Sequence, residues 1–355
     1  MTEWKEYKLG KIVTFQRGHD LPKDKMIDGD IPVAGSNGII GYHNRFTKEG
    51  PGVTIGRSGN IGIPHYYPNA YWAHNTVLYI VDFKGNDAKF MYYLLKTFDF
   101  TQLNTGSAVP SLNRNHIHEL PVSIPDVSTQ RRIASILSSL DDKIDLLHRE
   151  NATLEQMAET LFRQWFVVEA KEEWEESQFA EAIEVFDYLR RPLSKMERDK
   201  MKNGEQLYPY YGAAEIMDYI DSYLFDGEYI LMGEDGTVKT DDGYPILQYA
   251  TGKFWPNNHA HVLQAKSPHN NCFIWNYLKT TNIESIVTGA VQPKINQANL
   301  LSLPFYKYPI KLVEMYMRIT DDWWSKIMMN NKQIQTLIQT RDGLLPRLMS
   351  GEVKL

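Results

Sequence analysis

Apolar residues follow two different spacings along the chain. In two long stretches, short apolar runs such as Val53–Ile55, Val77–Val81 and Tyr229–Met232 are separated by clusters of Gly, Asn and Asp, as is typical of strands and turns. Residues 88–100 and their counterpart 271–279 have the spacing of a helix carried on such a sheet. Each stretch is therefore predicted to be an α+β domain.

The second spacing begins after Pro125, where Ser128 or Thr129 is predicted to cap a helix. Apolar positions then recur in alternating steps of four and three, as in a coiled-coil heptad. The predicted seam consists of Ile133, Leu137, Leu140, Ile144, Leu147, Asn151, Leu154, Ala158, Leu161 and Trp165. Asn151 interrupts it, and we interpret this residue as fixing the register, although a functional role stays open.

The second half of the chain repeats the first. Positions that set backbone shape return 177 residues later and, after roughly six extra residues near 238–243, 183 residues later. The pairs are Pro32 with Pro209, Gly35 with Gly212, Gly56 with Gly233, Gly59 with Gly236, Trp72 with Trp255, Asn75 with Asn258 and Asn113 with Asn296. The two halves are therefore predicted to share a fold.

The seam repeats at the same offset of 183 residues. The second seam is less apolar and consists of Tyr316, Thr320, Trp323, Ile327, Asn330, Ile334, Leu337, Arg341, Leu344 and Leu348. We interpret Asn330 and Arg341 as register residues too. Because each seam needs an apolar partner, the two helices are expected to pack antiparallel, with an approximate twofold axis between them and a globular domain at each end.

This pattern predicts four segments, namely domain 1 over 1–128, spacer helix 1 over 129–167, domain 2 over 168–310 and spacer helix 2 over 311–355. A helix of about 38 residues is roughly 57 Å long. That length corresponds to about 17 base pairs of duplex DNA.

Composition supports a folded protein with two domains, at 355 residues, 43% hydrophobic and 23% charged. The longest apolar runs are too short to cross a membrane. The first five residues show no secretory signal, so a cytoplasmic location is expected. Cys272 is the only cysteine, which excludes an internal disulfide and a multi-cysteine metal site.

The net charge of −6 argues mildly against nucleic-acid binding. The charge is uneven, because residues 168–310 alone carry −8. Much of this acidity lies in one run from Glu169 to Glu184, which we interpret as a solvated linker or helix face.

Five motifs, in this order along the chain, resemble the DNA specificity subunit of type I restriction-modification enzymes. They are Trp4-Lys5-x-x-Lys8-Leu9-Gly10, the Gly-rich run Ile55–Gly62, the run Thr105–Asn113, the helix from Gln130 to Asp145 and the ending Arg341–Val353. The second half departs from the first at Glu234-Asp235-Gly236, which replaces Arg57-Ser58-Gly59. It departs again at Glu181-Ala182-Ile183, which replaces Leu9–Ile12.

The resemblance implies two target recognition domains, each reading one half of a bipartite site in double-stranded DNA. It also implies that the helices set the gap and dock two methyltransferase subunits, which would carry S-adenosylmethionine. Restriction and translocase subunits, using ATP and Mg, would join them. No cofactor and no catalytic residue are expected in this chain.

Four other kinds of chemistry are weighed and set aside. The run Gly56–Gly62 lacks the Gly-Lys-Ser/Thr of a phosphate-binding loop, and the chain has no Pro-Pro dipeptide for an adenine-methylase motif. Asp141-x-Lys143 would align on a strand, as nuclease chemistry needs, but it lies in the predicted helix. His116-x-His118 and His259-x-His261 could face one metal from a strand, but neither has a third ligand nearby, so no metal site is predicted.

Base contacts are expected from Arg, Lys, Asn and Gln side chains in domain loops. The candidates in domain 1 are Gln16, Arg17, Asn37, Arg45, Arg57, Ser58, Asn60 and Arg114, and those in domain 2 are Tyr211, Thr237, Lys239, Lys253 and Lys294. A plain hairpin turn stays open for Arg57–Asn60. Tyr66, Tyr67, Tyr71 and Trp72 could stack on bases, although packing in the core is favoured. A self-sufficient methylase or nuclease and a coiled-coil scaffold without a DNA role are the competing hypotheses.

Overall fold

The computed structural model describes residues 4–103, 111–289 and 291–353. The run Thr105–Pro110 of the predicted motif therefore lies outside the described residues. The chain forms two compact units, which we call unit 1 (residues 1–147 and 331–355) and unit 2 (residues 148–330). Each unit combines one globular part with a segment of each long helix, α4 (Val127–Phe162) and α8 (Ile310–Met349). The predicted borders of the four segments stay a prediction.

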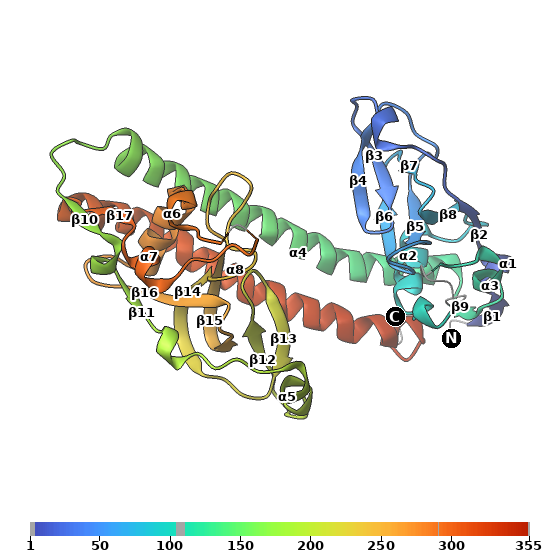
Figure 1. Ribbon diagram of the computed structural model, residues 1–355. Helices are drawn as coiled ribbons and strands as arrows, with labels where there is room; N and C mark the ends of the chain where they lie inside the picture. Colours follow the sequence, from blue (N-terminus) through green and yellow to red (C-terminus); the bar gives the residue numbers. More distant parts are fainter. Residues whose placement is uncertain (1–3, 104–110, 290, 354–355) are drawn as a thin grey trace. The chain divides into compact units, whose positions relative to one another are not determined.

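Unit 1 is built on short strands and three short helices (Figure 1). The strands are β1 (Lys5–Lys8), β2 (Thr14–Arg17), β3 (Ile31–Gly35), β4 (Gly38–His43), β5 (Gly52–Gly56), β6 (Pro64–Tyr67), β7 (Trp72–Ala73), β8 (Val77–Asp82) and β9 (Pro121–Ile124). The helices are α1 (Leu9–Ile12), α2 (Ala88–Lys96) and α3 (Arg114–His118). The sheets have the orders β2-β8-β5-β6, β4-β3-β7 and β1-β9.

Unit 2 repeats this plan with its own strands. They are β10 (Glu176–Gln178), β11 (Ile183–Val185), β12 (Tyr208–Tyr211), β13 (Ile216–Ile220), β14 (Phe225–Gly233), β15 (Leu247–Pro256), β16 (Ala260–Ala265) and β17 (Pro304–Tyr306). The helices are α5 (Lys195–Lys200), α6 (Asn271–Thr280) and α7 (Gln297–Leu301). The sheet orders are β11-β16-β14-β15-β12-β13 and β10-β17.

Strand register establishes the repeat. In unit 1, β3 pairs in parallel with β7 and places Val33 opposite Trp72. In unit 2, β12 pairs in parallel with β15 and places Tyr210 opposite Trp255. These are the residues that the offsets of 177 and 183 equate. The prediction that the halves share an α+β fold is therefore confirmed within each unit.

A proline explains why unit 1 has separate sheets where unit 2 has one. The single strand β15 of unit 2 corresponds to β6 and β7 of unit 1 together. Pro68, which has no backbone N–H to donate to a ladder, stands just after β6 and interrupts the strand. Its counterpart in unit 2 is Thr251, which continues β15.

The helices on the sheets begin at matching caps. Asp87 accepts a hydrogen bond from the backbone N–H of Phe90 at the start of α2, and Asn270 accepts one from Phe273 at the start of α6. Such caps satisfy N–H groups that have no partner in the first turn. α2 packs on β5 and β6, and α6 packs on β14 and β16. The predicted helix 88–100 ends earlier, at Lys96.

The cap of the first long helix differs from the prediction. α4 begins at Val127, and Asp126 accepts hydrogen bonds from the backbone N–H and the hydroxyl of Thr129, at 3.0 and 3.2 Å. Asp126 thus holds the role that was predicted for Ser128 or Thr129. The carboxylate suits this place because the helix N-terminus carries partial positive charge, and these hydrogen bonds hold the pKa of Asp126 below its usual range.

In each unit the segments of α4 and α8 run antiparallel. In unit 1, Arg341 donates to Asp141 at 2.8 Å, and Ile144 and Leu147 pack on Ile334. In unit 2, Asn330 donates to Asn151 at 2.8 Å through their side-chain amides. Further along the same pair, the Tyr316 hydroxyl donates to the backbone carbonyl of Ala158 at 3.1 Å.

Burial follows the predicted phase of the seams. Among the predicted residues, Ile133, Leu137, Ile144, Ile327 and Ile334 are buried, whereas Leu140, Leu154, Leu161, Trp323, Leu337 and Leu344 are partly buried. The seams also serve the globular cores, because Ile133 and Leu137 join the core of unit 1 and Ile327 joins that of unit 2. Trp324 is buried more deeply than its neighbour Trp323 and contacts Tyr249 of the sheet.

Candidate nucleic-acid interface

A glycine turn follows strand β5 in unit 1. The backbone N–H of Arg57 donates to Thr76 at 2.8 Å, and Leu112 donates to the carbonyl of Arg57 at 2.9 Å. Gly59 has a φ of +83°, which only glycine adopts readily. We call residues Arg57–Asn60 turn 1.

Two side chains next to turn 1 fix its shape. The buried Ser36 hydroxyl donates to the carbonyl of Ser58 at 2.6 Å. Asn60 donates to the side chain of Asn37 at 2.6 Å, and both residues are exposed. Turn 1 is therefore held from within while its outer side presents amide groups to solvent.

Unit 2 holds the same turn after β14, at residues Glu234–Thr237, which we call turn 2. Glu234 donates to His259 and accepts from Ile295, both at 2.8 Å, through backbone groups. His259 and Ile295 are the counterparts of Thr76 and Leu112. Gly236 has a φ of +79°, matching Gly59. The backbone frame of the two turns is thus the same.

The charged residues around the two turns differ although the frames match. Strand register equates Phe15 with Val185, an offset of 170, because they pair with Ile80 and Leu263 at equivalent places. By this offset Arg17 corresponds to Asp187, and Asp20 corresponds to Arg190.

Each unit carries an ion pair at these positions, with opposite polarity. Arg17 lies 3.8 Å from Asp20, and Arg190 lies 3.3 Å from Asp187. The first pair is exposed, with 54% and 74% of the two side chains accessible, whereas only 12% and 9% of the second are accessible.

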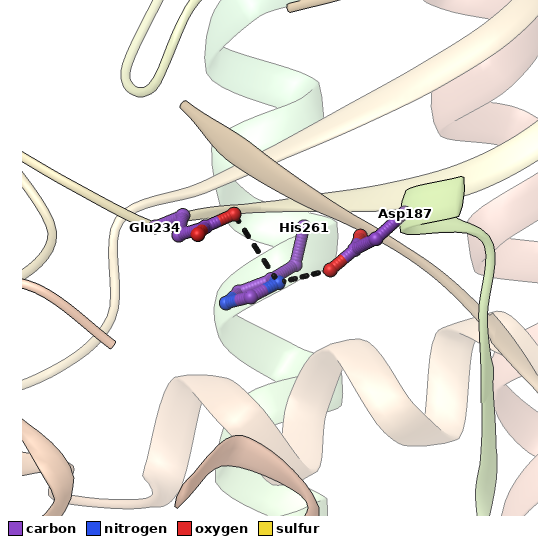
Figure 2. Close-up of side chains that lie close together, drawn as sticks. All are labelled: Asp187, Glu234 and His261. Carbon is purple, nitrogen blue, oxygen red and sulfur yellow. Dashed lines mark hydrogen bonds and ion pairs between the residues drawn. The ribbon is translucent and has the colours of Figure 1, made fainter. Parts of the chain in front are cut away.

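His261 forms the centre of the buried group in unit 2 (Figure 2). Its Nδ1 lies 2.6 Å from Asp187 and 3.8 Å from Glu234. Its Nε2 lies 2.9 Å from the carbonyl oxygen of Ile295, which can only accept a hydrogen bond. Nε2 therefore donates to this carbonyl, and Nδ1 faces the carboxylates. The equivalent residue of unit 1 is the buried Leu78.

Arg190 joins both carboxylates of this group. Besides Asp187, its guanidinium donates to Glu234 at 2.6 Å and to the carbonyl of Ala260 at 2.7 Å. Lys294 lies 3.4 Å from the other oxygen of Glu234 and is half exposed. We call Asp187, Arg190, Glu234 and His261 the turn 2 network. Opposite charges within hydrogen-bond distance compensate the cost of burying them.

This network also has the residue types of a metal site, because ligand atoms of Asp187, Glu234 and His261 lie within 4.8 Å of one another. Its ligand atoms are already engaged. Arg190 donates to Glu234, and His261 uses its two nitrogens for Asp187 and for Ile295. A divalent cation would have to displace the guanidinium and a ring proton. The arrangement is that of an ion-pair network.

The structure separates the candidates predicted in unit 1 into three groups. Arg57, Ser58 and Asn60 lie together in turn 1 with Asn37 beside them. Gln16 and Arg17 are exposed, but they lie in strand β2, so the expectation that they are loop residues is wrong. The remaining two candidates, Arg45 after β4 and Arg114 at the start of α3, are exposed at other places.

Two of the candidates predicted in unit 2 do not lie in loops. Tyr211 ends strand β12 and is buried against Phe254, and burial raises the pKa of its hydroxyl to about 12. It therefore belongs to the core, and its prediction as an exposed loop residue is wrong. Lys253 lies in β15 with its ammonium over the rings of Tyr208 and Tyr223.

The other candidates of unit 2 surround turn 2. Thr237 is an exposed residue of turn 2. Lys294 forms an isolated β-bridge with Asp235 of the same turn. Lys239 follows the turn and forms an ion pair with Glu284 at 2.9 Å. Turn 2 thus has two cations at its edge, of which Lys294 is the more exposed, at 49% against 29%.

The histidine pairs do not act as pairs. His116 and His118 lie in α3, where residues two apart point in different directions. His259 contacts Asp235, whereas His261 contacts Asp187. Asp141, of the nuclease-like string, accepts hydrogen bonds from Tyr93 and Arg341.

Sequence reasoning missed the turn 2 network. The replacement of Arg57 by Glu234 was visible, but its partners Asp187 and Arg190 are 47 and 44 residues earlier in the chain. The offset of 170 that equates Arg17 with Asp187 and Asp20 with Arg190 was a signal that could have shown the exchange of charge. It was hidden because few residues around it are identical.

Comparison with known proteins assigns the chain. Residues 1–156 and 171–312 each match the family described as the type I restriction modification DNA specificity domain. The chain belongs to this family. It is a DNA specificity subunit and not a methyltransferase or a nuclease, since the catalytic activities of such systems lie in partner subunits.

Similar proteins carry the same description. The specificity subunit S.HindORF215P of Haemophilus influenzae is 38% identical over 113 residues, which are 32% of this chain and 29% of that protein. The MjaIX specificity subunit of Methanocaldococcus jannaschii is 24% identical over 100% of this chain and 97% of its own length. The crystal structure of a type I system S subunit from M. genitalium has the same fold, with a TM-score of 0.63, 17% identity and coverage of 98% and 96% of the two chains.

The described helices are not of the kind that crosses a bilayer. Within residues 4–103, 111–289 and 291–353, no helix is both long enough and apolar enough to cross a membrane.

Proposed function

We propose that each unit of this specificity subunit reads one half of a bipartite DNA sequence, with turn 1 and turn 2 at the reading edges. One observation supports this most strongly. The backbone hydrogen bonds and the glycine of the two turns are equivalent, whereas Arg57, Ser58 and Ser111 are replaced by Glu234, Asp235 and Lys294. A common frame with different polar groups at one place suits two readers of different base pairs.

The remaining parts of the proposal concern the complex. α4 and α8 would set the gap between the half-sites and dock two methyltransferase subunits, and restriction and translocase subunits would join them. S-adenosylmethionine, ATP and Mg would bind in these partners. Partner subunits would also supply basic surface, because this chain has a net charge of −6.

Sequencing of methylated DNA tests the proposal. The chain is expressed with its methyltransferase subunit in a host without other adenine methylation. We expect one motif made of two specified parts separated by unspecified base pairs. A methylated motif without two separated halves would overturn the proposal, as would methylation by this chain without a methyltransferase subunit.

A further inference from the structure

The two units carry a cation next to the turn on different segments of the chain. In unit 1, turn 1 carries Arg57, and Ser111 forms a bridge to Ser58 on the facing segment. In unit 2, Glu234 takes the place of Arg57, and Lys294 takes the place of Ser111 and forms the bridge to Asp235. A positive charge is therefore present in both units, on opposite sides of the same bridge.

Glu234 connects this cation to the interior of unit 2. One of its carboxylate oxygens accepts from Arg190 at 2.6 Å, and the other lies 3.4 Å from the ammonium of Lys294. The first contact is enclosed, since 12% of Arg190 and 14% of Glu234 are accessible, whereas 49% of Lys294 is accessible. Arg190 thus fixes Glu234 on its enclosed side. On its other side, Glu234 holds the half-exposed ammonium of Lys294.

Backbone bonds hold the two segments together at this point. Ile295 donates to Glu234, and Gly236 donates to Pro293 at 3.0 Å. His261 fixes the same segment from beneath, because it donates to the carbonyl of Ile295. The network therefore bonds directly to Ile295, the residue after Lys294, while Gly236 of turn 2 bonds to Pro293, the residue before it.

We propose that Asp187, Arg190, Glu234 and His261 are positioning residues, and that they hold Lys294 as the base-contacting cation of unit 2 in the role that Arg57 has in unit 1. This inference rests on the proposed function. The chemical group that both cations suit is the guanine edge, which offers the acceptors N7 and O6 in the major groove. Arg57 can bind both acceptors at once, whereas Lys294 acts as a point charge.

The test uses the complete complex of this chain with its methyltransferase subunits. Initial methylation rates are measured on duplexes that carry the full site, one changed base pair in the first half, or one changed base pair in the second half. The variants are Lys294→Gln, Glu234→Gln and Arg57→Gln. The matched control is Lys307→Gln, because Lys307 also pairs with a glutamate in unit 2 and is similarly exposed, at 51%.

We expect Lys294→Gln to reduce discrimination at one guanine of the second half by roughly ten- to hundredfold, with discrimination in the first half unchanged. Glu234→Gln keeps Lys294 but loosens it, so it reduces the same discrimination less. Arg57→Gln gives the mirror result in the first half, and Lys307→Gln resembles the wild type. If Glu234→Gln does not assemble, Lys294→Gln still tests the inference, because Lys294 lies at the surface and its replacement should leave the fold intact.

Three results would overturn the inference. In the first, Lys294→Gln keeps wild-type discrimination in the second half. In the second, Lys294→Gln weakens both halves equally, which would make Lys294 a phosphate contact. In the third, Glu234→Gln leaves second-half discrimination unchanged while Lys294→Gln removes it, which would show that the network does not position Lys294. Failure of the proposed function looks different, because the wild-type complex itself would then show no requirement for two halves.

Discussion

Unit 1 and unit 2 share a backbone frame but place their charges differently. Unit 1 leaves the pair Arg17 and Asp20 exposed and fills the position of His261 with the apolar Leu78. Unit 2 encloses the reversed pair, Asp187 and Arg190, together with Glu234 and His261. The difference shows that the charged residues beside the turn can change while the glycine turn itself stays constant.

A second contrast lies where each globular part meets the long helices. In unit 1, Asp141 accepts hydrogen bonds from the Tyr93 hydroxyl at 2.6 Å and from Arg341 at 2.8 Å. The corresponding residues of unit 2 are Trp324, Asn276 and Ala158. A polar junction in unit 1 is thus replaced in unit 2 by an apolar one, where Trp324 packs on Tyr249 and Trp275. Each globular part is therefore fitted to its own helix segments.

The largest effect is expected at the apolar junction of unit 2. Trp324→Ala removes a buried indole that packs on Tyr249 and Trp275, with ring centroids 4.8 and 5.9 Å away. We expect unit 2 to lose about 3–5 kcal/mol of stability, because the change removes a large buried side chain and leaves a cavity. Tyr93→Phe in unit 1 removes only a hydroxyl and should cost about 1 kcal/mol.

Urea unfolding of the full chain, followed by hydrogen exchange in peptides of each unit, measures both changes. Equal losses from Trp324→Ala and Tyr93→Phe would contradict the contrast between an apolar and a polar junction.

A slightly smaller effect is expected in the turn 2 network. Arg190→Ala leaves Asp187 and Glu234 enclosed without their main cation, and we expect unit 2 to lose about 3 kcal/mol. Arg17→Ala removes the cation of the exposed pair in unit 1 and should change stability by less than about 0.5 kcal/mol. Hydrogen exchange of β14 and β16 reports the first change. Similar small values for both variants would show that the network contributes no more than a surface pair.

The seam of unit 2 offers a third comparison, between a single and a double change. Asn330→Leu leaves the amide of the buried Asn151 without the hydrogen bond at 2.8 Å, so it should cost about 1–3 kcal/mol. The double variant Asn151→Leu with Asn330→Leu removes both polar groups and should recover most of that loss. The recovered protein should show weaker preference for one helix register. Thermal unfolding of the wild type, the single variant and the double variant measures these stabilities, and a double variant less stable than the single one would argue against a register role.

Acid should act more strongly on unit 1. Burial lowers the pKa of His65, His74 and His118 there, and of His269 in unit 2. The unfolded chain therefore takes up these protons first, near pH ~6.5. Stability is present above that pH and is lost as the pH falls through the lowered values of the folded state.

Protection from hydrogen exchange, measured between about pH 7 and pH 5, should decrease more in β5 and β8 than in β14 and β16. The smallest expected change is that His65→Gln reduces this difference. Equal acid sensitivity of the two units would contradict the prediction.

Residues that constrain the backbone made the fold predictable. The repeated Gly59 and Gly236 occupy left-handed backbone conformations, and the heptad spacing followed the buried face of α4 and α8. The position of turn 1 was predicted correctly because its glycines mark a turn in the sequence. The start of α4 was missed because its capping residue, Asp126, lies before the apolar pattern begins. Asp126 accepts a hydrogen bond from the backbone N–H of Thr129, three residues later.

The network could not be predicted because it depends on distant residues. Asp187, Glu234 and His261 come from three separate segments, and only pairing of β11, β14 and β16 brings them together. Tyr211 illustrates the opposite case. It was predicted among the loop residues, but it ends strand β12, and aromatic packing against Phe254 buries it.

The exchange of the globular part of unit 1 tests the central claim most directly. Residues 1–128 are replaced by the corresponding segment of a relative with a known methylation motif, and methylated DNA is sequenced from cells that contain the hybrid and its methyltransferase subunit. If each unit reads its own half-site, one half of the motif changes to that of the relative and the other half stays the same. A change in both halves, or in neither, would contradict the account.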